Sequence, residues 1–155
     1  MAVTLRVNGT THAIDADAST PLIYILRNQL GLSGVKLGCG LEQCGACTVI
    51  ADGQTALSCV KTLGEFAGKD ITTIEGLAAH PIGAAVQKAF ITENAAQCGY
   101  CTPGMVSEAT ALLSRNTNPT REQTIEAMNT HLCRCGSHTR VLKAIARVAG
   151  GKVDA

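Results

Sequence analysis

Eight cysteines are the residues of this 155-residue chain whose type and spacing could do chemistry. They fall into a first set, Cys39, Cys44, Cys47 and Cys59, and a second set, Cys98, Cys101, Cys133 and Cys135. Four thiolates are the ligand number of a tetrahedral zinc site and of an iron–sulfur cluster. The count therefore predicts two metal centres, and the alternative is a secreted scaffold held together by disulfides.

The composition disfavours the disulfide scaffold. Hydrophobic residues make up 46% of the chain, which is enough for a buried core without covalent staples. The first twenty residues alternate apolar and polar positions and lack the order of a signal peptide. We therefore expect reduced cysteines and a cytoplasmic location. The alternative is a periplasmic or membrane-associated location reached by export together with a partner subunit.

The first set has the spacing of a plant-type 2Fe–2S loop. Residues 39–47 read C-x4-C-x2-C, and eleven residues separate Cys47 from Cys59. Such a loop must bring backbone N–H groups close to sulfur, and small residues at three positions permit this: Gly38, Gly40 and Gly45. A zinc ribbon is the alternative, but zinc ribbons typically use C-x2-C-like knuckles. The spacing therefore predicts a 2Fe–2S cluster.

The second set combines C-x2-C at residues 98–101 with C-x-C at residues 133–135. Each pair lies where one predicted helix gives way to the next. Helix N-termini expose unpaired N–H groups and a positive partial charge, which suit a negatively charged cluster of thiolates and iron. However, C-x2-C is also found in zinc knuckles and redox dithiols. By its own spacing this set leaves zinc and an iron–sulfur cluster open.

Strands and one helix must position the first set. Alternating apolar residues at 3–7 and turn-forming Asn8-Gly9 predict a hairpin with a second strand near residues 12–15. A helix is predicted from Pro21 to Gly31, capped by Ser19 or Thr20. Further strands are expected at residues 47–51, 55–60 and 71–74, with Asp52-Gly53 joining the first two. The first half is therefore a small sheet crossed by one helix.

Helices alone must position the second set. Proline and capping residues predict four helices, at residues 81–94, 102–115, 120–129 and 137–149. Thr102 and Ser137 are the expected caps of the second and fourth helices, and Thr120 with Gln123 has the spacing of a capping box. The four histidines are not needed as ligands. His12 and His80 are expected at the surface, and His131 and His138 in solvent or interface contacts.

Taken together, the two sets resemble one family. Three motifs in this order resemble the small iron–sulfur subunit of the molybdenum hydroxylases, the xanthine oxidase and aldehyde oxidoreductase family. They are the plant-type loop, Cys98-Gly99-Tyr100-Cys101-Thr102-Pro103-Gly104-Met105, and Cys133-Arg134-Cys135. The resemblance implies an α+β protein. Residues 1–76 would form a β-grasp 2Fe–2S ferredoxin domain, and residues 77–155 an all-α four-helix domain with a second 2Fe–2S cluster.

The resemblance also implies a role and partners. The chain would be the non-catalytic electron-transfer subunit of an oxidoreductase that oxidises an aldehyde or an aromatic N-heterocycle. A large subunit would hold the molybdenum–pterin cofactor near the second cluster, and a flavin or cytochrome c subunit or domain would accept the electrons. The family match places Gln97 against the pterin, with an ordinary polar loop residue as the alternative, and makes all eight cysteines iron ligands.

One position narrows the resemblance to a branch. Gly136 directly follows the last cysteine, whereas many relatives have Thr-Gly-Tyr there. This resembles the branch with isoquinoline oxidoreductase, nicotinate dehydrogenase and certain bacterial aldehyde dehydrogenases. In that branch electrons commonly leave through c-type haem rather than flavin.

Composition and charge exclude other classes of function. A net charge of +1 and 3% aromatic residues do not suit a nucleic-acid partner, and no apolar run is long enough for membrane insertion. Two rivals stay open beside this role. One is a free-standing ferredoxin, which would act without a complex, and the other is a zinc-stabilised interaction module, which would contain no iron.

Overall fold

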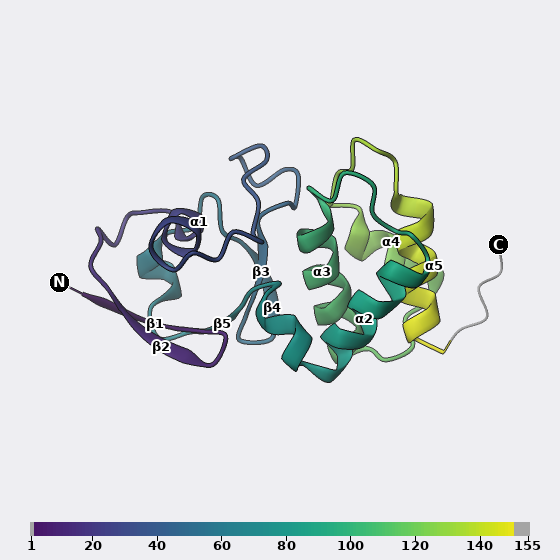
Figure 1. The fold of residues 1–155 in the computed structure, drawn as a ribbon, viewed down its shortest axis with the longest axis horizontal. Helices are drawn as coiled ribbons and strands as arrows, with labels where there is room; N and C mark the ends of the chain where they lie inside the picture. Colours follow the sequence, from purple (N-terminus) through teal and green to yellow (C-terminus); the bar gives the residue numbers. More distant parts are fainter. Residues whose placement is uncertain (1, 151–155) are drawn as a thin grey trace.

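The computed structural model describes residues 2–150 and places a sheet beside a group of helices. The strands and a short helix lie at one end of the molecule, and α2 (Pro81–Thr92) to α5 (His138–Val148) lie at the other (Figure 1). The loop before β3 and the loop before α5 rise on the same side of the molecule. This arrangement brings the two cysteine-bearing regions together.

The sheet has five strands in the order β2-β1-β5-β3-β4. Their bounds are β1 Val3–Val7, β2 Thr10–Ile14, β3 Thr48–Ala51, β4 Gln54–Leu57 and β5 Asp70–Thr72. β1 and β5 are parallel, and the other neighbours are antiparallel. Both predicted hairpins are confirmed. Their turn residues adopt positive φ, 51° and 81° at Asn8-Gly9 and 50° and 80° at Asp52-Gly53.

The helix predicted from residue 21 is correct in place but wrong in detail. It consists of α1 (Leu22–Tyr24) continued by η1, a π-helical turn over Ile25–Gln29. Neither Ser19 nor Thr20 caps it, because the Ser19 hydroxyl donates to Asp17 and Pro21 is extended and bridged to Thr62. The helix is therefore joined directly to the chain segment that follows β4.

Two short 3-10 helices, which the sequence patterns did not predict, lie in the connection between the two halves. η2 spans Leu63–Phe66 and begins with a capping box of Thr62 and Glu65. η3 spans Gly76–Ala79 and leads directly into α2. Leu63, Phe66 and Leu77 are buried, so this connection contributes to the cores of the molecule.

Four helices follow within residues 81–148, as predicted. They are α2 Pro81–Thr92, α3 Thr102–Arg115, α4 Arg121–Met128 and α5 His138–Val148. α3 is buried along most of its length, because it packs on α2, α4 and β3. The capping box of Thr120 and Gln123 on α4 is confirmed. The cap predicted for α3 is wrong, since Cys101 occupies that position and Thr102 is already helical.

Two apolar clusters form the interior. One joins the sheet to α1 and includes Leu5, Leu22 and Phe66, and the other surrounds α3 and includes Met105 and Ile145. Ile50 of β3 belongs to the helical cluster, so the sheet and the helices share a packed boundary. Within residues 2–150, no helix is both long and apolar enough to cross a membrane.

Candidate metal centres

The first cysteine set is built by one loop and one hairpin. Cys39 and Cys44 lie in the loop between η1 and β3, Cys47 immediately precedes β3, and Cys59 follows β4. The β3–β4 register pairs Thr48 with Leu57, and the Ser58 N–H donates to the Cys47 carbonyl. These bonds bring Cys47 and Cys59 together in the core, while Cys39 stays exposed.

Backbone donors surround the outer sulfurs of the first set. The N–H groups of Gln43 and Leu41 each donate to Cys39 Sγ at 3.3 Å, and they lower the pKa of the Cys39 thiol to about 7. The Cys39 N–H donates to Cys44 Sγ at 3.3 Å. A Cβ at Gly38 would lie 2.6 Å from Cys44 Sγ, so a side chain there would displace this sulfur. The loop thus stabilises thiolates, the form that binds metals.

At Cys47, the inner sulfur before β3, burial outweighs the backbone N–H groups of Cys59 and Ser58, which act in the opposite direction. Burial, followed by the neighbouring Cys59 thiol, raises the pKa of Cys47 to about 12. Cys47 therefore holds its proton until a cation replaces it, because a bound metal ion deprotonates a coordinating thiol outright. The donor set therefore fits a metal centre in the core of the sheet.

The second set is built by helix ends that are far apart in the sequence. Cys98 follows α2, Cys101 is the N-cap of α3, and Cys133 and Cys135 lie between α4 and α5. Ser137 was predicted to cap α5, and it occupies the N-cap position without a capping bond. Its hydroxyl instead lies 3.2 Å from Cys133 Sγ and donates to that sulfur.

The neighbouring sulfurs of the second set are those of Cys101 and Cys133, and their pKa values are shifted in opposite directions. Burial opposes ionisation of Cys133, but the Ser137 hydroxyl and N–H and the Cys101 thiol outweigh it and lower its pKa to about 6. Burial and the adjacent Cys133 raise the pKa of Cys101 to about 12. The Cys133 side of this pair is therefore prepared for a cation by hydrogen bonds from Ser137.

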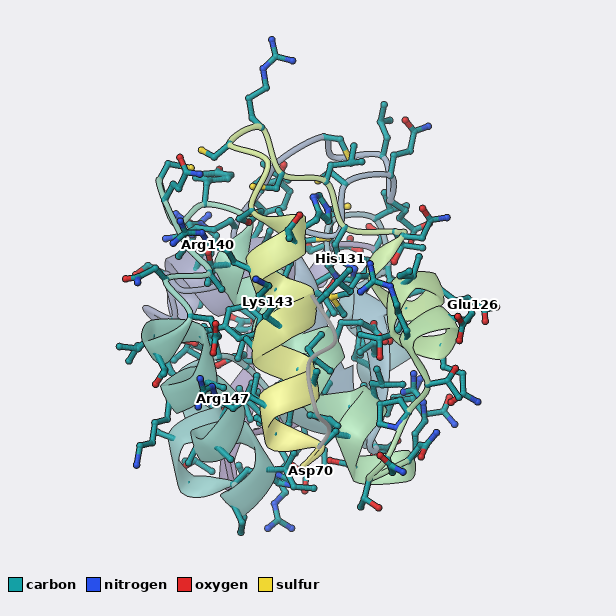
Figure 2. All side chains as sticks on the ribbon, turned by 90° about the vertical axis from the view of Figure 1, so that its right-hand side faces the viewer. Asp70, Glu126, His131, Arg140, Lys143 and Arg147 are labelled. Atoms are coloured by element: carbon teal, nitrogen blue, oxygen red, sulfur yellow. The ribbon has the colours of Figure 1, made fainter. Side chains whose placement is uncertain are left out.

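Both sets consist of sulfur pairs rather than one converging group. Among residues 2–150, no three His, Cys, Asp or Glu side chains converge as ligands of a single metal ion. A 2Fe–2S cluster gives each of two irons two thiolates, and the neighbouring sulfurs of Cys47 with Cys59 and of Cys101 with Cys133 fit this requirement. Sulfur atoms gather at the upper end of the molecule in Figure 2.

Gln97 lies beside the second set, as its position before Cys98 requires. Its exposed side chain donates from Nε2 to the Cys135 carbonyl at 3.1 Å. This bond joins the loop before α3 to the loop before α5. Among the described residues the Gln97 amide has no other hydrogen bond, so its oxygen is free to accept one.

The loops of the two sets contact each other, which the sequence patterns did not predict. The Leu132 N–H donates to the Cys44 carbonyl at 3.0 Å, and the Tyr100 hydroxyl donates to the Leu37 carbonyl at 2.5 Å. A Cβ at Gly104 would lie 2.2 Å from the Gly45 carbonyl oxygen. We call this contact between residues 37–48 and residues 100–104 and 130–132 the seam.

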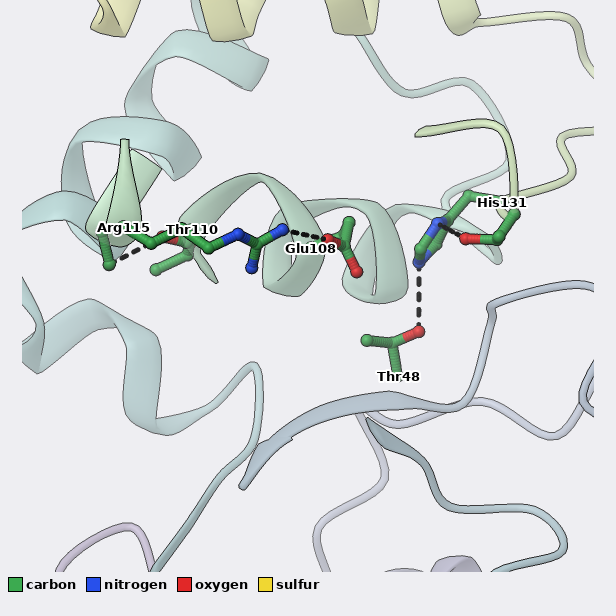
Figure 3. A network of polar contacts seen from close by, with 7 residues as sticks. Thr48, Glu108, Thr110, Arg115 and His131 are labelled. Carbon is green, nitrogen blue, oxygen red and sulfur yellow. Dashed lines mark hydrogen bonds and ion pairs between the residues drawn. The ribbon is translucent and has the colours of Figure 1, made fainter. Parts of the chain in front are cut away.

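His131 lies within the seam and is 2% exposed. Its Nε2 lies 3.1 Å from the Thr48 hydroxyl, and its Nδ1 lies 3.1 Å from the Thr130 hydroxyl (Figure 3). Burial lowers the pKa of His131 against the opposing effect of the Glu108 carboxylate. The expectation of solvent or interface contacts for His131 is wrong, because the packing of the helices on the first cysteine loop buries the ring within the chain.

Charged side chains lie mostly away from the cysteines. Arg140, Lys143 and Arg147 follow the exposed side of α5 (Figure 2). Arg147 pairs with Glu93 of the loop after α2 at 2.6 Å, and Glu108 pairs with Arg115 at 3.3 Å. In both pairs the arginine is about half exposed, whereas Glu93 is mostly covered and Glu108 is buried.

Two family models match the chain in succession. Residues 5–70 match a 2Fe-2S iron-sulfur cluster binding domain, and residues 73–146 match a second 2Fe-2S binding domain. Each match contains one complete cysteine set.

Similar proteins cover nearly the whole chain. A nicotinate dehydrogenase subunit of Pseudomonas putida is 51% identical over 95% of this chain and 94% of its own length. The alpha chain of isoquinoline 1-oxidoreductase from Brevundimonas diminuta is 47% identical over 83% and 84%, respectively. The crystal structure of quinoline 2-oxidoreductase from Pseudomonas putida 86 includes a chain with a TM-score of 0.89 and 34% identity, matched over 97% of this chain and 94% of that one.

Proposed function

The chain belongs to the small 2Fe–2S subunits of the molybdenum hydroxylases, and from this premise we propose that it conducts electrons from a large subunit to an acceptor. In its family two 2Fe–2S clusters lie on the small subunit, with the molybdenum–pterin cofactor on the large one. When bound, each cluster takes up and releases one electron at a time. The observation that carries the proposal is the seam, where the Leu132 N–H joins one cysteine loop to the other at Cys44.

We assign the first set as the ligands of one cluster and the second set as the ligands of the other. In the first set, Cys39 with Cys44 and Cys47 with Cys59 form the two pairs. In the second set, Cys101 neighbours Cys133, which leaves Cys98 and Cys135 as the outer pair. The chain buries Cys47 and Cys59 and supplies N–H donors to Cys39 and Cys44 in the first set, and Ser137 donates to Cys133 in the second. Burial and hydrogen bonds to sulfur both tune a cluster's potential.

Each of the two proposed clusters belongs to one domain of the chain. We propose a boundary at residues 76 and 77, between a β-grasp domain and a helical domain. Separate apolar clusters and the two successive family matches support it. We expect chemistry on the substrate to occur in the large subunit, because that subunit holds the molybdenum–pterin cofactor in this family.

An aromatic N-heterocycle is the proposed substrate class of the complex. The two sequence relatives described above are named for nicotinate and isoquinoline, and the structural relative for quinoline. These names favour a heterocycle over an aldehyde. We propose a c-type haem acceptor rather than flavin, on the single position of Gly136 after the last cysteine.

Metal analysis tests the cluster assignment directly. The purified protein should contain about four iron and four acid-labile sulfide atoms per chain. Electron paramagnetic resonance (EPR) after reduction should show two distinct signals. A colourless protein with zinc in place of iron would refute the proposal and favour the interaction module. Isolation without a large subunit, together with full function as a soluble carrier, would favour the free-standing ferredoxin.

Gln97 tests the orientation of the second set toward the pterin. Gln97→Ala keeps every thiol and should retain both clusters, but it should slow reduction of the second cluster by substrate in the assembled complex. The lost hydrogen bond costs about 0.5–1.5 kcal/mol. Gln43→Ala is the matched control, because Gln43 is an exposed glutamine beside the first set and its N–H donor to Cys39 is retained. Equal reduction rates in both variants and the wild type would show that Gln97 is only a loop residue.

A further inference from the structure

The hydrogen bonds around His131 form a chain with a fixed direction. The Thr48 hydroxyl donates its only proton to the Gly45 carbonyl at 2.7 Å. Thr48 can therefore only accept from His131 Nε2, which must carry a proton. In the neutral imidazole, Nδ1 then accepts from the Thr130 hydroxyl. The geometry thus defines which nitrogen of His131 is protonated.

This chain of bonds connects the two cysteine loops. Thr48 follows Cys47 directly, and Gly45 lies between two cysteines of the first set. On the other side, His131 lies two residues before Cys133. Its backbone carbonyl accepts a bond of 2.7 Å from His138 Nε2 at the start of α5. One buried side chain therefore contacts the supports of both metal centres.

The imidazole packs closely against the first cysteine loop. A Cβ at Gly45 would lie 2.5 Å from His131 Cδ2, so the ring rests directly on the backbone of the first loop. The next residue, Leu132, donates its N–H to the Cys44 carbonyl. Ring packing, a side-chain bond and a backbone bond all act at the same point of the seam.

We propose that His131 is a positioning residue that sets the distance and orientation between the two metal centres, by locking the loop of Cys133 onto the loop of Cys44 and Cys47. This inference rests on the proposed function, because it requires both centres to hold clusters. It assigns His131 no contact with iron or substrate. The hydrogen bond to Thr48 fixes the orientation of the two loops, and the packing of the ring on Gly45 fixes the distance between them.

Three variants separate the bond from the packing. His131→Phe keeps a ring on Gly45 but has no donor for Thr48, whereas His131→Gln keeps an amide donor. Thr48→Val removes the acceptor from the other side. His12→Ala is the control, because His12 is a partly exposed histidine on β2, remote from the seam.

The readout is the magnetic interaction between the two reduced clusters, which depends steeply on their separation and orientation. In the reduced wild type, EPR should show lines split by this interaction. We expect the splitting to be lost or changed in His131→Phe and Thr48→Val, and retained in His131→Gln and His12→Ala. Iron content should stay at the wild-type value in all four. Hydrogen exchange at the Leu132 amide should become faster in the two variants that change the splitting.

The outcomes distinguish this inference from the proposed function. A wild type with fewer than two clusters refutes the proposed function, whatever the variants do. Two clusters in the wild type with no splitting, or an unchanged splitting in fully loaded His131→Phe and Thr48→Val, overturns the role of His131 alone. Loss of iron from both variants also overturns it, because His131 would then support ligation rather than geometry.

Discussion

Residues 39–59 contain every cysteine of the first set, within one loop and the β3–β4 hairpin. The second set draws on residues 98–135, at the ends of α2, α3 and α4. The first centre therefore depends on local chain geometry, whereas the second depends on how helices pack. The chain thus builds a set of four thiols in two different ways. We therefore expect different substitutions to disrupt the two sets.

Removal of one ligand from each set should give the largest effect. Cys44→Ser should eliminate the first EPR signal and about half of the iron, and Cys133→Ser should eliminate the second signal instead. Cys133→Ser should also destabilise the helices more than Cys44→Ser destabilises the sheet, since metal binding that spans distant segments is coupled to folding. EPR and thermal unfolding measure both effects. Loss of both EPR signals in either variant would show that the two clusters do not assemble independently of each other.

Core truncation should separate the two centres by their dependence on packing. Ile145→Ala on α5 and Leu5→Ala on β1 each remove a fully buried side chain, at a cost of about 2–5 kcal/mol. During denaturant titration, Ile145→Ala should release the second cluster early, because its ligands are held by helix packing. Leu5→Ala should affect the first cluster less, since the loop and hairpin persist locally. Equal shifts of both clusters in both variants would remove the distinction.

A methyl group at Gly104 should disturb the seam itself. Gly104→Ala would place a Cβ 2.2 Å from the Gly45 carbonyl oxygen, and backbone must move at a cost of about 1–3 kcal/mol. Gly64→Ala is the control, because its closest backbone atom would be 3.3 Å away, within the sheet region. The midpoint temperature of thermal unfolding should fall clearly more in Gly104→Ala than in Gly64→Ala. A larger fall of the midpoint in Gly64→Ala would show that the sheet and the helices are not closely packed at Gly104.

The smallest expected effect is at Tyr100. Tyr100→Phe removes only the hydroxyl that donates to the Leu37 carbonyl, at a cost of about 0.5–1.5 kcal/mol. Tyr24→Phe is the matched control, because Tyr24 is a similarly exposed tyrosine on α1, at 42% against 49%. A denaturation midpoint that falls in Tyr100→Phe and not in Tyr24→Phe would confirm the bond across the seam. Identical midpoints would mean that solvent replaces it without loss.

Local patterns determined most elements, because short-range interactions encode them. The Asn8-Gly9 and Asp52-Gly53 turns allow the positive φ that their hairpins require, and Thr120 with Gln123 caps α4 as its spacing predicts. The C-x4-C-x2-C spacing likewise predicted a 2Fe–2S site for the first set, because three of its cysteines lie within residues 39–47. The second set was ambiguous by spacing alone, and the family resemblance was needed to interpret it.

Only the tertiary structure decided how distant segments meet. Ser137 was predicted as a helix cap, yet its hydroxyl turns to Cys133, because the sulfur brought near by folding competes with the helix end. His131 carries no sign in the sequence that Thr48, 83 residues away, will be its partner. Residue types specify which bonds are possible, and packing selects among them. The sequence by itself determined the eight thiols and their local frames, and the seam that joins them exists only because the sheet and the helices pack together.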